Sequence, residues 1–287
     1  MCIRDSYQAA LSTPLPVSIV VVAYQGRQLT SEALDAVLAH SQRPFELVLV
    51  DNGSRDGTLD LFLELERRRD PAVPVQVLRN AENVGYPLAA NQGARAARGR
   101  HVVLLNNDTR VRPGWLDALL AASASAPKVG VVTAKVLNLD GSVQSAGGVL
   151  HHPDGAFTIP HASEDRLAPT VTQRREVDNA GGPCLLLTRE LLQAVAPDGQ
   201  VFDPAFTPGY FEDSDLCLRA REAGFSLVYA PAAEVFHHGK ATANLVAREG
   251  RVDVWGQFER NKQRFYERWR GRLEADERRP VSYTHLR

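Results

Sequence analysis

Short apolar runs alternate with stretches of helical periodicity through the first half of the chain. The run 17–23 is almost continuously apolar and rich in β-branched residues, which is typical of a strand buried on both faces. Further strand-like runs lie at 45–50, 75–78, 101–105 and 129–136, and helical patterns lie between them at 29–40, 56–69, 89–98 and 113–124. This alternation predicts βαβ units and a mostly parallel central sheet flanked by helices.

The rhythm changes after Asn138. Residues 139–178 are rich in Gly, Pro, His and polar side chains, and we interpret them as an insertion or loop region with short antiparallel strands. Strands are then predicted at 184–187 and 226–230, and helices at 189–194 and 214–223. Residues 245–278 are highly charged, with aromatic residues interspersed, and are expected to be helical. The fold class is therefore α/β, with a C-terminal helical extension.

The two ends of the chain follow neither the pattern nor the composition of their neighbours. We expect residues 1–14 and 281–287 to be non-native or disordered flanks, and we exclude them from the fold argument. The remaining chain divides into one domain at 15–243 and a helical extension at 244–280.

Composition narrows the functional classes. The 287 residues carry 33 basic and 34 acidic side chains, for a net charge of -1, which argues against a nucleic-acid partner. Three cysteines without a CxxC pair predict no disulfide framework and suit a reducing compartment. No apolar run approaches the roughly 20 residues that span a bilayer, and no signal peptide is visible, so we expect a cytoplasmic protein.

Polar residues follow several of the predicted strands, where open parallel sheets place their ligands. Asp51 ends a strand, and a carboxylate there can accept hydrogen bonds from a base or a ribose. Asp56 is more simply explained as a helix N-cap. Tyr24 could pack beside a base or belong to a plain glycine turn, and Asn83 could read a base or hold a loop.

Acids and histidines mark two further places. Asp108 follows a buried strand, where an acid can bind a hard divalent cation, although many strand ends carry Asn-Asp. The segment 212–215 contains three acids at a helix start beside aromatic residues. Acids there suit the helix dipole, and apolar surroundings can also raise a carboxyl pKa toward that of a general base. The two adjacent histidines, His237 and His238, could bind a metal ion or have a structural role.

The order and spacing of these motifs closely resemble family 2 glycosyltransferases of the GT-A (Rossmann-like) fold. The resemblance covers residues 15–243, and its nearest match is the rhamnosyltransferase-like and galactofuranosyltransferase-like branch. It rests on segments spread over the whole range, namely 17–24, 50–58, 83–91, 105–108, 182–189, 211–219 and 237–239.

The resemblance implies an inverting enzyme that moves a sugar from a nucleotide-diphosphate sugar, with dTDP- or UDP-sugars favoured, to a hydroxyl of a glycan or a lipid-linked acceptor. It implies Mg²⁺ or Mn²⁺, held by Asp108 and His237, and Asp213 as the general base in a pair with Glu212. The nucleotide-binding positions would be Ala23, Tyr24, Asp51, Asn83, Gly85, Asn91 and Asn107. The donor-sugar and acceptor region would contain Gly182, Asp215 and His238.

The chain departs from the family pattern at two positions. Asn106 stands where the first acid of the family's DxD motif is expected, so one carboxylate remains for the metal. Lys240 replaces a glycine after His237 and could contact the diphosphate. We expect acceptor specificity to lie in residues 139–178 and around 181–182.

Alternatives remain open for both function and assembly. A sugar nucleotidyltransferase would usually carry a Gly-rich basic loop after the first strand, which is absent from residues 24–27. A non-catalytic sugar- or nucleotide-binding module would tolerate loss of the acids at 212–215, which are present. The C-terminal helix is expected to pack on the domain by its aromatic face or to form a homodimer contact, with peripheral contact at the inner face of the cell membrane as the alternative.

Overall fold

The computed structural model describes residues 16–150, 157–239 and 253–276. Ten strands form one sheet: β1 (Val17–Ala23), β2 (Phe45–Asp51), β3 (Val75–Arg79), β4 (His101–Asn106), β5 (Thr109–Val111), β6 (Val129–Leu137), β7 (Val143–Ser145), β10 (Arg175–Glu176), β11 (Cys184–Thr188) and β12 (Ser226–His237). A separate pair is formed by β8 (Val149–Leu150) and β9 (Phe157–Thr158). The helices are α2 (Arg27–His40), α3 (Thr58–Arg68), α4 (Tyr86–Ala96), α5 (Trp115–Ser123), α6 (Arg189–Val195), α7 (Glu212–Glu222) and α9 (Val254–Asp276), with short 3-10 turns η1 (Pro169–Val171) and η2 (Pro204–Phe206).

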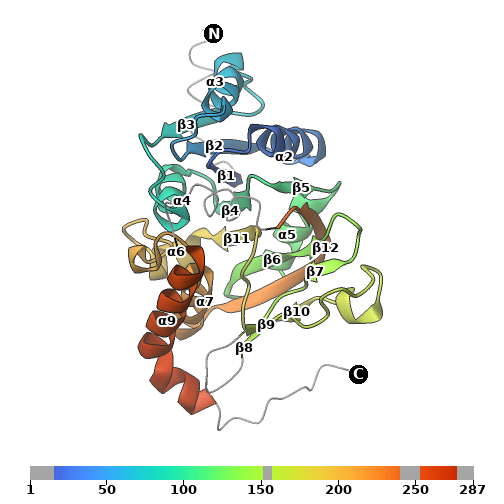
Figure 1. Ribbon diagram of the computed structural model, residues 1–287. Coiled ribbons are helices and arrows are strands. Elements are labelled where there is room, and N and C mark those ends of the chain that lie inside the picture. The colour runs from blue at the N-terminus through green and yellow to red at the C-terminus, as the bar shows by residue number, and fades with distance from the viewer. Residues whose placement is uncertain (1–15, 151–156, 240–252, 277–287) are drawn as a thin grey trace.

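The order of the strands places a topological switch at the centre of the sheet. The order is β10-β12-β6-β11-β4-β1-β2-β3, with β5 beside β12 and β7 beside β6 (Figure 1). Strand β1 is parallel to both β2 and β4, so the chain builds outward on one side through β3 and then returns to the other side. Ligands of such sheets bind outside the carboxyl ends of the strands at the switch. Here that position is the edge formed by the ends of β1, β2 and β4.

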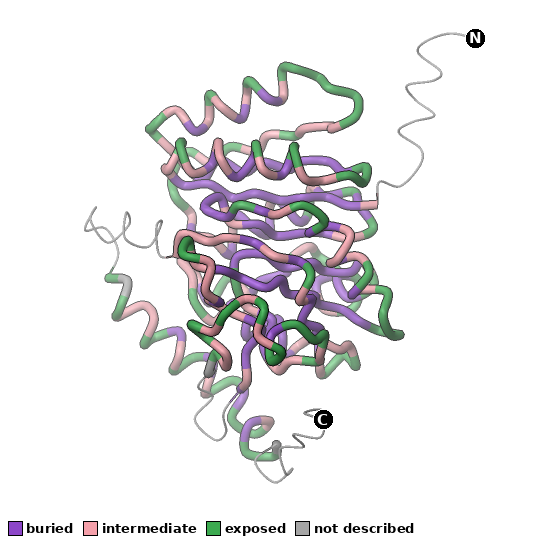
Figure 2. The backbone as a smooth tube through the Cα atoms, turned by 90° about the vertical axis from the view of Figure 1, so that its right-hand side faces the viewer, coloured by how far each residue is buried: buried purple, intermediate pink, exposed green. Residues whose placement is uncertain are grey.

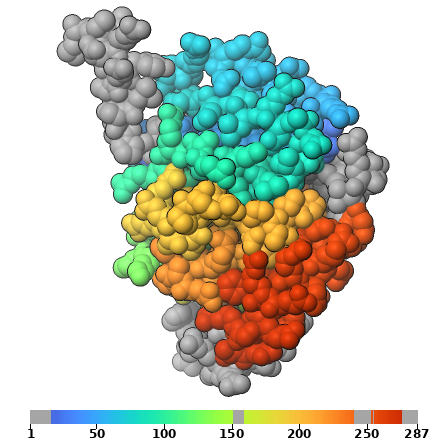
Figure 3. All heavy atoms as spheres, turned by 90° about the vertical axis from the view of Figure 1, so that its left-hand side faces the viewer, coloured from blue at the N-terminus to red at the C-terminus, as the bar shows by residue number. Residues whose placement is uncertain are grey.

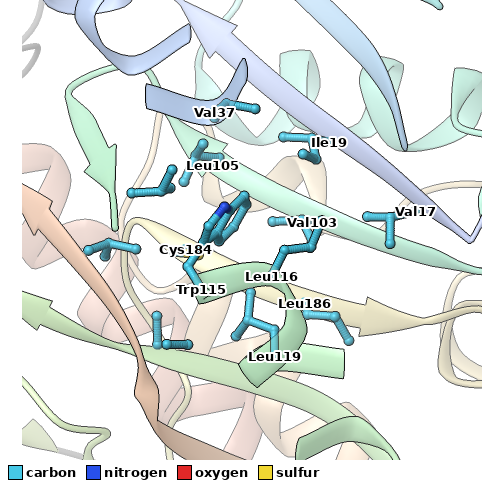
Figure 4. Packing of buried hydrophobic residues seen from close by; sticks show 14 of the residues in the cluster. Val17, Ile19, Val37, Val103, Leu105, Trp115, Leu116, Leu119, Cys184 and Leu186 are labelled. Carbon is cyan, nitrogen blue, oxygen red and sulfur yellow. The ribbon is translucent and has the colours of Figure 1, made fainter. Parts of the chain in front are cut away.

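Helices cover both faces of the sheet. The first face packs against α2, α3 and α5, with fully buried Trp115 at its centre (Figure 4). The second face packs against α4, α6 and α7. The central strands are buried along nearly their whole length (Figure 2), which explains why they appear in the sequence as continuous apolar runs.

The expected fold is confirmed, with two local differences. Strand β11 is antiparallel to both β4 and β6, so the sheet is mixed on that side. Strand β12 continues to His237 rather than ending at 230, because an irregularity after Ala230 lets it pair with β5, a short strand that we did not predict. Cys184 and Cys217 are free and buried, as expected of packing residues.

Helix α9 packs on the domain by its aromatic face, as predicted. Phe265, Trp269 and Leu273 are buried against Phe206 and Leu218. Figure 3 shows the helix lying along one side of the domain. Charged side chains such as Glu259, Glu267 and Arg270 are exposed, whereas the polar Asn261 is buried on the same side as the aromatic face. In the part of the chain that the structure describes, no helix combines the length and the apolar character needed to cross a membrane.

Candidate active site

The loops after β1 and β2 are joined at the carboxyl edge of the sheet. Ala23 and Asp51, the last residues of these strands, lie side by side in the register. Asp51 is buried and accepts a hydrogen bond from the Ser54 backbone N–H at 3.3 Å. Burial raises the pKa of Asp51 above its ordinary value. The structure therefore places both of these predicted nucleotide-binding residues at the switch point, beside buried Tyr24.

A network of amide side chains fixes the neighbouring loops. Asn52 Nδ2 donates to Asn83 Oδ1 at 2.9 Å, and Asn80 Nδ2 donates to Asn52 Oδ1 at 3.0 Å. Asn83 Oδ1 also accepts the Gly85 backbone N–H at 2.9 Å. Of the two interpretations of Asn83, the loop-holding one accounts for these contacts. Its position after β3 keeps it near the same edge.

Two predicted nucleotide-binding amides face inward. Asn91 is buried, donates to the Phe202 carbonyl at 2.7 Å and accepts the Phe202 N–H at 2.8 Å. Its assignment to the nucleotide is therefore corrected, because both ends of the amide are occupied by the backbone of a distant loop. Asn107 is buried too, and its Nδ2 donates to Thr30 Oγ1 at 2.9 Å and to the Gln25 carbonyl at 3.3 Å. Asn107 thereby ties the loop after β4 to the loop after β1.

Asp108 and His237 meet at the junction of β5 and β12. Asp108 Oδ1 lies 3.2 Å from His237 Nε2, although the two residues are far apart in the sequence. The other ring nitrogen, Nδ1, lies 2.7 Å from Gln144 Oε1, so Nδ1–H donates to this amide oxygen and fixes the orientation of the ring. His238 donates its backbone N–H to the Asp108 carbonyl, and its own Nε2 is buried without a hydrogen-bond partner.

This pair fits a divalent cation that completes its coordination elsewhere. Neighbouring ligands of an octahedral ion at about 2.1 Å are about 3 Å apart, close to the separation of the Asp108 and His237 atoms. No group of three or more His, Cys, Asp or Glu side chains with metal-binding placement occurs among the described residues. Mg²⁺ commonly takes only one or two protein carboxylates and fills its other positions with phosphate oxygens and water. Lys240, the other residue expected near a diphosphate, lies outside the described residues.

Glu212 and Asp213 begin helix α7 in an environment that suppresses charge. Glu212 is buried, and its Oε2 has no hydrogen-bond partner. Burial, together with the charge of Asp213, raises the pKa of Glu212 to about 8. Asp213 is half-buried, and burial raises its pKa as well, while the N–H groups of Ser214 and Gly182 stabilise its charge. The charge of Asp213 is one of the causes of the raised pKa of Glu212, so Asp213 loses its proton before Glu212 does.

The loop before β11 connects this acid pair to the other end of the site. Gly181 packs directly against the Asp213 carboxylate, so a Cβ at this position would overlap it. Gly182 adopts a φ of +124° with open space beside it, and its backbone bonds to Asp213. The next residue, Pro183, accepts the backbone N–H of Asn106 at 2.9 Å. Gly182 and Pro183 thus connect Asp213 by hydrogen bonds to Asn106, which immediately precedes the loop that contains Asp108.

Asp215 was assigned to the sugar region, and the structure corrects this. Its carboxylate is fully buried and accepts hydrogen bonds from Arg219 Nε at 2.8 Å, Arg268 Nη1 at 2.9 Å and Trp269 Nε1 at 3.0 Å. Both oxygens are therefore occupied by the protein itself. Asp215 joins α7 to α9 rather than facing a substrate.

Three residues near the site were missed by sequence reasoning. Tyr86 begins α4, and burial together with the charges of Glu212 and Asp213 raises the pKa of its hydroxyl far above the ordinary value. Gln144 orients His237 from β7, and Asn179 accepts the Gly181 N–H at 3.1 Å. Tyr86 stands in the segment 83–91, which carries part of the family resemblance, whereas nothing in the sequence around Gln144 or Asn179 indicates these contacts.

Comparison with known proteins assigns the chain to a family. Residues 14–268 match the model of the glycosyltransferase-like family 2. An uncharacterized protein of Sinorhizobium fredii is 32% identical over 92% of this chain, which spans 28% of that relative. The N-acetylglucosaminyl-diphospho-decaprenol L-rhamnosyltransferase of Mycobacterium tuberculosis is 32% identical over 77% of this chain and 75% of its own length.

Solved structures agree on the fold. GalNAc-T7, solved with UDP, GalNAc and Mn²⁺, superposes with a TM-score of 0.62 at 18% identity, over 79% of this chain and 44% of that one. At this identity the likeness establishes the architecture alone. Together with the family match and the rhamnosyltransferase relative, it shows that the chain belongs to glycosyltransferase family 2, in a rhamnosyltransferase-like branch with the GT-A fold.

Proposed function

We propose that the protein transfers a sugar from a nucleotide-diphosphate sugar to an acceptor hydroxyl with inversion at the anomeric carbon, in a reaction that needs a divalent cation. The observation that carries this proposal is the Glu212–Asp213 pair. Burial and the charge of Asp213 raise the pKa of Glu212 to about 8; burial raises the pKa of Asp213 as well, while the N–H groups of Ser214 and Gly182 stabilise its charge. Such a split between neighbouring carboxyls is how active sites set apart acid and base roles.

In the proposed reaction, Asp213 takes the proton of the acceptor hydroxyl. The acceptor oxygen forms a bond to the anomeric carbon, the bond from that carbon to the diphosphate oxygen breaks, and the nucleoside diphosphate leaves with the electron pair. Attack from the face opposite the leaving group gives inversion in one step. Base catalysis of this kind typically contributes about 10²–10⁴-fold. The buried thiols of Cys184 and Cys217 have no nucleophilic role in this reaction, because no covalent intermediate forms.

The leaving diphosphate calls for positive charge. Asp108 and His237 would hold Mg²⁺ or Mn²⁺, which when bound neutralises charge on the phosphate oxygens. Gln144 fixes the ring of His237 so that Nε2 faces the site. This arrangement matches a common pattern in which the second ring nitrogen of a metal-binding histidine bonds to a carbonyl or carboxylate.

On the donor side, Asp51 would bond to the base or the ribose, with Ala23 and Tyr24 beside it. We favour dTDP- or UDP-sugars as donors. For the acceptor we propose a glycan hydroxyl, with lipid-linked glycans as the leading class, supported by the decaprenol-linked substrate in the name of the Mycobacterium tuberculosis relative. Peripheral contact with the inner face of the membrane and a homodimer are part of this proposal.

The first test is a thermal-unfolding panel with UDP, dTDP, GDP, CDP and ADP, each with and without Mn²⁺. A ligand at 100 times its Kd stabilises by about 2.7 kcal/mol, which moves the midpoint of a domain of this size by about 5 °C or more. We expect one nucleotide to act strongly, and only with metal, and Asp108→Ala to remove the metal-dependent part. No stabilisation by any of the five would contradict the proposal.

The stereochemistry is read from the product. The nucleotide that stabilises the protein identifies which sugar donors to offer with a soluble acceptor analogue. NMR of the anomeric proton of the product, compared with that of the donor, is expected to show the inverted configuration. A retained configuration would overturn the single-displacement mechanism while leaving transferase activity intact.

A further inference from the structure

Asn261 of helix α9 is completely buried and makes hydrogen bonds with its whole amide group. Its Nδ2 donates to three backbone carbonyls of one loop, those of Phe206 at 2.7 Å, Gly209 at 2.8 Å and Tyr210 at 3.2 Å. Its Oδ1 accepts from Gln257 Nε2 at 3.0 Å and from Arg264 Nη1 at 2.7 Å. The NH2 group thus donates only to this loop and the oxygen is held by the helix itself, so Asn261 fixes the loop against α9.

The loop held in this way leads directly into the acid pair. Tyr210 and Phe211, the residues immediately before Glu212, have φ values of +74° and +70°. Side chains other than glycine rarely adopt this left-handed conformation, and it persists only where the surroundings fix it. Asn261 holds the carbonyl of Tyr210, at the start of this unusual turn. The direction in which α7 begins therefore depends on a contact from α9.

The other side of the same loop contacts the start of α4, which follows the loops expected to bind the nucleotide. Pro208 accepts the backbone N–H of Tyr86 at 3.0 Å. Gly85 packs so closely on the loop that a Cβ there would lie 2.7 Å from Thr207 Cγ2 and 2.8 Å from Pro208 Cα. Gln257 of α9 holds the Thr207 carbonyl at 3.1 Å. The loop is thus fixed between α9 and the start of α4.

A second contact from α9 secures the acid pair from behind. Asp215, two residues after Asp213, bonds to Trp269 and Arg268 of α9. Figure 3 shows α9 lying along the part of the molecule that contains α7 and its preceding loop. Hydrogen bonds from one helix therefore reach the chain on both sides of Glu212 and Asp213.

We propose that Asn261 is a positioning residue for the catalytic pair and that α9 belongs to the support of the active site. Asn261 acts through the loop 206–211: it sets where Glu212 is buried and where Asp213 points, without touching a substrate. The inference rests on the proposed role of Asp213 as the base. It predicts that loss of the Asn261 amide impairs the chemical step and leaves the nucleotide edge unaffected.

The test compares Asn261→Asp with the wild type, using full-length protein. Aspartate keeps the shape but turns the donor into an acceptor facing three carbonyls. Misplacement of a reacting group by about 1 Å can cost about 10²-fold, so we expect kcat to fall by about 10- to 100-fold. The donor KM and the nucleotide-dependent thermal stabilisation are expected to stay within about twofold, and the acid limb of the kcat–pH profile is expected to move. Gln263→Ala, an exposed position on the same helix, is the matched control and should keep wild-type kcat.

Two gentler variants keep the inference testable if Asn261→Asp does not fold. Gln257→Ala removes one bond to the loop and one to Asn261, and Trp269→Phe removes the indole N–H donated to Asp215 together with part of a buried ring. Each is expected to lower kcat by several fold with unchanged nucleotide stabilisation. Unchanged kcat and pH profile in the folded variants would overturn the inference. If Asp213→Asn keeps wild-type kcat, it is the proposed base that fails, an outcome the Asn261 series cannot produce.

Discussion

The polar side chains in the loops after the first strands are hydrogen-bonded to one another, whereas at the start of α7 a buried carboxyl oxygen is not hydrogen-bonded. In the first region the amides of Asn52, Asn80 and Asn83 bond to one another and to the backbone. In the second, Glu212 is buried with one carboxyl oxygen lacking any hydrogen bond. A buried polar atom without a partner costs stability, so it is tolerated where the protein gains something else. The difference separates polar side chains that hold the loops from a carboxyl group whose burial is consistent with the role that we propose for the acid pair.

A second contrast lies within a single helical turn. Asp213 and Asp215 are two residues apart at the start of α7, but one is half-buried beside a protonatable neighbour and the other is saturated by Arg219, Arg268 and Trp269. Both residues are aspartates in the first turn of α7. What differs is the set of donors supplied by α9.

Asp213→Asn gives the largest expected effect and tests the functional side of this contrast. The amide keeps the shape but cannot take a proton, so kcat should fall by about 10²–10⁴-fold. The thermal stabilisation of the protein by nucleotide should be unchanged, because Asp51, Asp108 and His237 are untouched. Steady-state kinetics and thermal unfolding measure the two quantities, with exposed Asp60→Asn as the control. Wild-type turnover in the variant would remove Asp213 from the mechanism.

Asp215→Asn tests the structural side. Removing one partner of a buried charge network typically costs about 3–5 kcal/mol, because Arg219 and Arg268 lose their carboxylate. We expect a clear loss in the free energy of unfolding, measured in urea. Asp213→Asn is expected to change that free energy much less. If the two variants were equally stable, the contrast drawn between these acids would be wrong.

Glu212→Gln is read from the pH dependence of the free energy of unfolding. Burial raises the pKa of Glu212 in the folded protein to about 8, whereas the pKa of this group in the unfolded chain is near its ordinary value of 4.5. Between these values the native state binds more protons, so this group makes stability fall as pH rises, by at most about 1.4 kcal/mol per pH unit.

Glutamine cannot ionise, so the variant should lose that slope and be more stable than the wild type at pH 8. Urea unfolding at several pH values between 5 and 8 measures it, with exposed Glu259→Gln as the control. An unchanged slope would show that Glu212 is not the buried, protonated member of the pair.

The sequence was most informative where local pattern and fold coincide. The strand 17–23 and its neighbours were predictable because strands buried on both faces must be continuously apolar. Asp51 and Asp108 were found by their positions at strand ends, and the structure places both at the predicted edge. The domain boundary at residue 243 stays a prediction, and the family match runs on to residue 268.

The errors come from contacts between distant parts of the chain. Asn91 is satisfied by Phe202, 111 residues away, and Asp215 by Trp269, 54 residues away. Gln144 reaches His237 across 93 residues. The three-residue strand β5 is too short to show any periodicity, and it exists because β12 continues to pair with it. Motif spacing identifies which residues are near the site, but their hydrogen-bond partners decide which of them are available.

The contacts of Asn261 also bear on the order in which the protein becomes competent as it is synthesised. Strands β1, β2 and β4, with the loops that follow them, are complete before residue 110 has been made, whereas Asn261 follows Asp213 by almost fifty residues. A nascent chain that ends between these two positions has its nucleotide edge and its acids but not the amide that holds their loop. We therefore expect such a chain to bind donor before it can transfer the sugar, because the support that α9 gives to the acid pair is added only after both acids have been made.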